Sequence, residues 1–100
     1  MERSGRRLLV EEALAEANPE ALFADGFDQA LVGHVVNHHQ PKVAVYDLDL
    51  CVLILTRGGM SEEDAREYLE FNVVGAYAGK HGPLFIWSIG GRQKIIEESP

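Results

Sequence analysis

The stretch VAVYDLDLCVLILTRGG, residues 43–59, decides the fold expected for this chain. Its first four residues are an unbroken apolar run, which is typical of a central strand. Asp47 or Asp49 can then cap a helix that runs to about Arg57, where two glycines end it. Residues 48–55 are apolar on every side, so a strand remains open for them. As a helix they would be buried all round or would expose a patch to a partner.

Outward from this stretch, the patterns predict one α+β domain with a core at about residues 8–89. A mixed or antiparallel sheet of about four strands is expected to pack against two or three helices. The strands are expected near residues 21–24, 30–36, 43–46 and 84–89, with a hairpin around Asp25-Gly26. The helices are expected at residues 8–17, 48–57 and 62–77. Residues 1–7 and 90–100 are expected to be flexible ends.

The last predicted helix has a clear start signal. Ser61 can cap it, and Glu62 and Arg66 are spaced to form an ion pair one turn apart. One stripe of the helix is expected to face the core, formed by Ala65, Tyr68, Leu69, Asn72, Val73 and Ala76. A polar side chain in such a stripe needs partners, so Asn72 either fixes the packing against the neighbouring strand or recognises a ligand.

The charge of the chain is concentrated in its middle. The formal net charge is −7, but residues 8–79 hold 13 acidic residues against three basic ones, while both ends are slightly basic. Such a body disfavours direct nucleic-acid binding and suits a basic protein partner. The expected partner-binding face consists of Glu62, Glu63, Glu67 and Glu70. In the alternative interpretation, the charge only keeps the chain soluble.

A rival hypothesis is a small ligand- or metal-binding protein, or a minor hydrolase, that uses polar groups at strand ends. Its candidate residues are Asp25, Asp28, Asp47, Asp49 and Asn72, together with the cluster His34, His38 and His39. The histidines could equally belong to a solvated loop. No nucleotide, zinc or nucleophile motif is present, so no cofactor, metal ligand or catalytic residue is assigned.

The single cysteine, Cys51, rules out an internal disulfide and fits a reducing cytosol. It is expected to be a buried thiol and not a nucleophile. No membrane span or secretion signal is expected, so a cytoplasmic location is predicted. A third hypothesis is a homo-oligomer whose contact lies around Val52 and Leu53.

Six segments occur in order along the chain: NPEA (18–21), DGFDQALVG (25–33), AVYD (44–47), Cys51, GMS (59–61) and EFNVVGAY (70–77). As a set they resemble a family of small uncharacterised proteins met in bacteriophage and prophage genomes and in some prokaryotes. The family has no assigned activity, so the resemblance implies a phage or host-cytoplasm context and no mechanism. The chain departs from the pattern at Val52-Leu53, where charged residues are usual, and in its histidine cluster. An accessory factor that binds a host protein is therefore the leading hypothesis.

Overall fold

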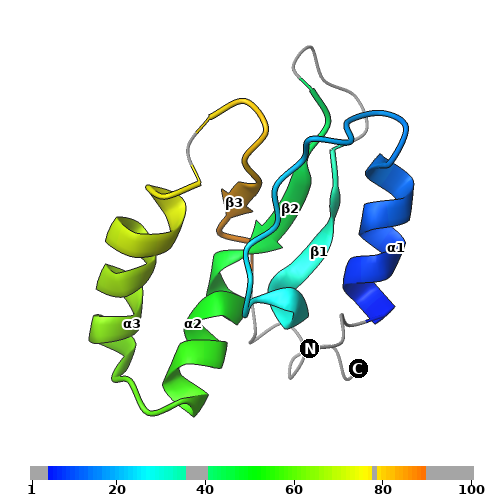
Figure 1. Cartoon of the computed structure of the whole chain (residues 1–100). Helices are drawn as coiled ribbons and strands as arrows, with labels where there is room; N and C mark the ends of the chain where they lie inside the picture. Colours follow the sequence, from blue (N-terminus) through cyan, green and yellow to red (C-terminus); the bar gives the residue numbers. More distant parts are fainter. Residues whose placement is uncertain (1–4, 36–40, 78, 90–100) are drawn as a thin grey trace.

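A three-stranded mixed sheet forms the middle of the protein (Figure 1). In the computed structural model, which describes residues 5–35, 41–77 and 79–89, the central strand is β2 (Ala44–Asp47). It pairs antiparallel with β1 (Leu31–His34) and parallel with β3 (Leu84–Ile86). The α+β domain with a mixed sheet is therefore confirmed, but with three strands in the described residues.

Three α-helices surround the sheet. Figure 1 shows α1 (Gly5–Leu14) beside β1, while α2 (Leu48–Arg57) and α3 (Glu62–Tyr68) lie side by side at the other end of the fold. A π-helical turn, η2 (Leu69–Val74), continues α3. The chain therefore leaves the sheet through α2 and returns through α3, which lets β3 run parallel to β2. None of the helices in the described residues has the length and apolar character that a bilayer crossing requires.

The expected strand at residues 21–24 and the hairpin after it are wrong. The amide of Leu22 donates to the carbonyl oxygen of His81 at 2.9 Å, and the amide of Ala24 donates to the phenol oxygen of Tyr46 at 2.9 Å. The backbone of this segment therefore bonds to a loop and to a side chain rather than to a strand. Gly26, with φ of 90°, turns the chain into the short 3₁₀ helix η1 (Asp28–Ala30), which precedes β1.

The junction between β2 and α2 follows the sequence prediction. The helix begins at Leu48, directly after the strand, and ends at Arg57. Asp47 caps it, since its Oδ1 accepts from the amides of Asp49 at 2.8 Å and Leu50 at 3.4 Å. Residues 48–55 are thus helical, and the strand left open for them is excluded.

The first helix is displaced from its predicted position. It spans residues 5–14 instead of 8–17, so residues 5–7 are part of a helix and not of a flexible end. After the helix, the buried Asn18 side chain donates through Nδ2 to the carbonyl oxygen of Lys42 at 2.8 Å and so holds the turn against the loop before β2. The expected flexible segment 90–100 lies outside the described residues.

The α3 helix starts as expected, with the Ser61 Oγ accepting from the amide of Asp64 at 3.1 Å. Its inward stripe is narrower than predicted: Ala65, Leu69 and Val73 are buried, whereas Tyr68, Asn72 and Ala76 are exposed. A π-turn holds more residues than an α-turn, so the π-helical segment keeps side chains spaced by four on one face. Asn72 consequently faces away from the core, and its expected place in the apolar stripe is wrong.

Candidate functional site

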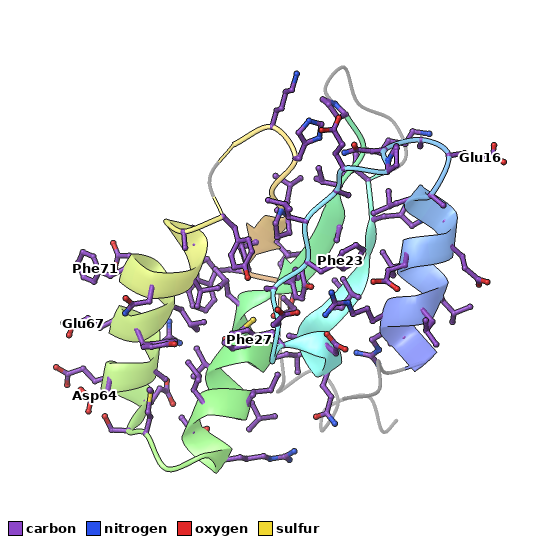
Figure 2. All side chains as sticks on the ribbon, in the orientation of Figure 1. Glu16, Phe23, Phe27, Asp64, Glu67 and Phe71 are labelled. Atoms are coloured by element: carbon purple, nitrogen blue, oxygen red, sulfur yellow. The ribbon has the colours of Figure 1, made fainter. Side chains whose placement is uncertain are left out.

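The outward side of α3 is the most strongly charged helix surface of the described residues. Helix α3 and η2 together carry five carboxylates and one guanidinium. Figure 2 shows Asp64, Glu67 and Phe71 pointing away from the rest of the molecule. We name the acidic face by the four residues expected from the sequence, all of which are exposed: Glu62, Glu63, Glu67 and Glu70.

Arg66, the one arginine of this helix, lies on the side of the helix that faces Trp87. The Arg66 guanidinium lies 3.5 Å from Glu62 Oε2, as the sequence spacing predicted. The same guanidinium stacks on Trp87, with 4.8 Å from its carbon to the centre of the ring. Cation–π attraction and the ion pair therefore both hold Arg66 toward Trp87. The ion pair involves one of the four carboxylates of the acidic face, so the face as a whole keeps a net negative charge.

Phe71 is the largest apolar side chain displayed among these carboxylates, with 71% of its surface exposed. It lies two positions from both Leu69 and Val73, which point into the core, so it falls on the opposite side of the helix. Because most of its ring stays in water, folding buries little of its apolar surface. The sequence interpretation assigned Phe71 no role, although its spacing from the apolar stripe was the available signal.

A hollow of about 470 Å³ adjoins the acidic face, between α3, the start of α2 and the residue that follows β3. We name it the Trp87 hollow; its walls are Leu48, Arg66, Leu69, Glu70, Val74 and Trp87. Arg66 and Glu70 belong to the helix that carries the acidic face, so the two surfaces are continuous. Trp87 is 53% exposed, and thus part of the indole is accessible from this hollow.

The buried carboxylate Asp47 is occupied by structural contacts. While Oδ1 caps α2, Oδ2 accepts a hydrogen bond of 2.5 Å from the hydroxyl of Ser88. Ser88 follows β3, so the bond ties together the ends of the two parallel strands. Asp49 lies in the first turn of α2 and contributes its backbone amide to the cap.

Asp25 and Asp28 surround a different cation, Arg7 of α1. The guanidinium lies 2.9 Å from Asp25 Oδ1, 3.6 Å from Asp28 Oδ1 and 3.2 Å from Glu11 Oε2. Burial lowers the pKa of Arg7, but the hydrogen bonds to Asp25 and Glu11 outweigh it, so the pKa is raised overall. The guanidinium also lies 5.0 Å from the centre of the Phe23 ring. These carboxylates thus join α1 to the segment before β1.

The polar residues expected at one site are dispersed. Asp28 lies by Arg7, Asp47 is bonded to Ser88, and Asn72 is exposed on η2. The part of the chain that the structure describes holds no group of three or more side chains able to bind a metal ion. His38 and His39 lie outside the described residues, while the Nδ1 of His34 lies 3.3 Å from the carbonyl oxygen of Val35.

Two further expected residues turn out to be internal. Burial, with a smaller contribution from the charge of Asp47, raises the pKa of the Cys51 thiol to about 12. The thiol therefore stays protonated at neutral pH, as a structural cysteine does. Val52 is 0% exposed and so has no surface to offer a second copy, which corrects its expected role as an oligomer contact. Leu53 is only partly buried and lines a separate hollow.

No family model, curated protein or solved structure matches the chain. The acidic face, Phe71 and the Trp87 hollow therefore carry the functional inference, because they combine exposed apolar surface with a defined charge.

Proposed function

We propose that this protein is a non-enzymatic interaction protein that binds a basic surface of a partner protein through the acidic face and Phe71. The observation that carries the proposal is the 71% exposure of Phe71 on a helical segment that carries five carboxylates and one guanidinium. The resemblance to small phage and prophage proteins supports a partner in a host cytoplasm, where an accessory factor would act.

The energetics favour this combination. Burying a phenylalanine side chain contributes about 1.5–3 kcal/mol, and interface hot spots begin at about 2 kcal/mol. Carboxylates around such an anchor remain solvated at the rim, where they add little affinity but speed the approach of a cationic partner. Phe71 would therefore determine the lifetime of the complex, and Glu63 and Glu67 its rate of formation.

Affinity capture from a host lysate, read by mass spectrometry, tests the proposal. We expect Phe71→Ala, and separately the double change Glu63→Lys with Glu67→Lys, to remove the same partner that the unchanged protein retains. Two changes in residues 9–16, on α1 and in the turn after it, act as matched controls. Leu9→Ala removes an apolar side chain that is 69% exposed, and Glu12→Lys with Glu16→Lys reverses two exposed charges on the N-terminal segment.

The controls should retain the partner, because they alter the exposed apolar surface or net charge to a similar extent at another place. Equal capture by all variants would show that neither Phe71 nor the acidic face takes part.

Light scattering across a range of concentrations tests the remaining expectation of a homo-oligomer, since a mass that does not change from the monomer value contradicts it.

A further inference from the structure

We propose that the Trp87 hollow receives an apolar side chain from the basic segment that the acidic face binds. The inference rests on the proposed function and adds to it the chemistry of the partner: a cationic segment with one leucine-like or phenylalanine-like residue at its centre. The hollow and the acidic face share one helix, so a single bound segment can contact both.

The walls of the hollow support an apolar occupant. Leu48, Leu69 and Val74 line it with aliphatic groups, and Trp87 adds an aromatic face. A volume of about 470 Å³ exceeds what one side chain fills, so a leucine or phenylalanine enters without displacing the core. Removing such a side chain from water is the main source of affinity at a small contact.

The charges at the mouth favour a cationic backbone around that anchor. Glu70 lines the hollow, and Glu62 is paired with Arg66 at its edge. Arg66 is held by Glu62 and by the Trp87 ring, 4.8 Å away, so it is less available to an incoming anion. Lysine or arginine residues beside the anchor can therefore meet Glu70, whereas an acidic segment would be repelled by the acidic face.

Trp87 is the only tryptophan of the chain and stands in the wall of the hollow, so its fluorescence reports occupancy directly. The probes are two short acetylated lysine-rich peptides, identical except for a central leucine in one and a central serine in the other. We expect the leucine peptide to bind at least about tenfold more tightly. It should also shift the Trp87 emission to shorter wavelength and reduce quenching by acrylamide.

Variants separate the contribution of the hollow to peptide affinity from the contribution of the acidic face. Val74→Phe narrows the hollow with a larger side chain and should reduce the affinity of the leucine peptide toward that of the serine peptide. Val32→Phe makes the same change at a half-exposed valine on β1 and should leave both affinities unchanged. If circular dichroism shows that Val74→Phe does not fold, Val74→Met narrows the hollow with a more adaptable side chain.

The outcomes distinguish the two proposals. Equal affinities for the two peptides and an unchanged Trp87 spectrum would overturn the hollow as an anchor site while leaving the acidic face as a binding surface. Absence of binding by both peptides would overturn both proposals. A spectral shift that depends on protein concentration without peptide would assign the hollow to a second copy of the chain, and this also overturns the inference.

Discussion

Replacing Asp47 by alanine tests how the centre of the fold is held together. The carboxylate has two roles, since one oxygen caps α2 and the other accepts from Ser88 at 2.5 Å. Alanine removes both contacts at once from a residue that is 6% exposed. Asp47→Ala therefore releases the start of α2 and the end of β3 together.

The two contacts determine how much stability Asp47→Ala is expected to remove. Loss of an aspartate cap costs about 1 kcal/mol. A hydrogen bond to a charged group contributes about 1.5–3 kcal/mol. We expect Asp47→Ala to lower the free energy of unfolding by about 2–4 kcal/mol, a large part of the 5–15 kcal/mol typical of a small domain. Asp47→Asn keeps a capping oxygen and should lose only about 1–2 kcal/mol.

Urea unfolding followed by circular dichroism measures these losses without relying on Trp87, which adjoins Ser88 in sequence. A double-mutant cycle with Ser88→Ala isolates the contact between the two side chains, and we expect an interaction energy of about 1–2 kcal/mol. Asp49→Ala is the matched control, because the Asp49 side chain makes no contact with the cap in the described residues and its loss should cost under about 1 kcal/mol. A loss at Asp47→Ala no larger than that of the control would refute the reasoning.

Four other outcomes are expected. Burial raises the pKa of Cys51 from 9.0, and that of Tyr46 from 10.0, to about 12 each. Because the unfolded chain loses these protons first, the stability should be full below about pH 9 and fall toward pH 12. Cys51→Ala should make this fall of the unfolding free energy with pH less steep, as measured by urea titrations at successive pH values. Tyr46→Phe leaves the amide of Ala24 without its acceptor and should cost about 1–3 kcal/mol by thermal unfolding. Arg7→Met should cost about 1.5–3 kcal/mol in urea, less in acid, where the surrounding carboxylates become protonated. Phe71→Ala should change the free energy of unfolding in urea by less than about 0.5 kcal/mol, since a binding residue is not a core residue.

The best-predicted part of the fold is the junction of β2 and α2, because its signals are local. A capping aspartate after an apolar run and a pair of glycines that begins at residue 58 define both ends of α2. The cap of α3 at Ser61 is predictable for the same reason. Each signal acts within one or two helical turns and needs no knowledge of the rest of the chain.

The strand prediction for residues 21–24 failed because the hydrogen-bond partners of this segment are remote in the sequence. Its amides bond to the carbonyl oxygen of His81 in a loop and to the side chain of Tyr46, and not to the backbone of a neighbouring strand. An apolar run before Asp25-Gly26 resembles the first arm of a hairpin, and only the tertiary structure reveals that it crosses to other acceptors instead. Long-range contacts of this type leave no mark on local periodicity.

Part of the candidate site was predictable from local sequence, and the part that depends on remote contacts was not. The exposed glutamates follow from the helical pattern of α3, and Phe71 could have been found by its spacing from Leu69 and Val73. The Trp87 hollow could not, because it exists only where β3 returns parallel to β2 and brings Trp87 against Arg66. That contact also affects the electrostatics, because Arg66, which is paired with Glu62 and stacked on the indole, leaves the other carboxylates of the acidic face to a partner's cations. The parallel strand therefore contributes both a wall for an apolar anchor and the charge asymmetry around it.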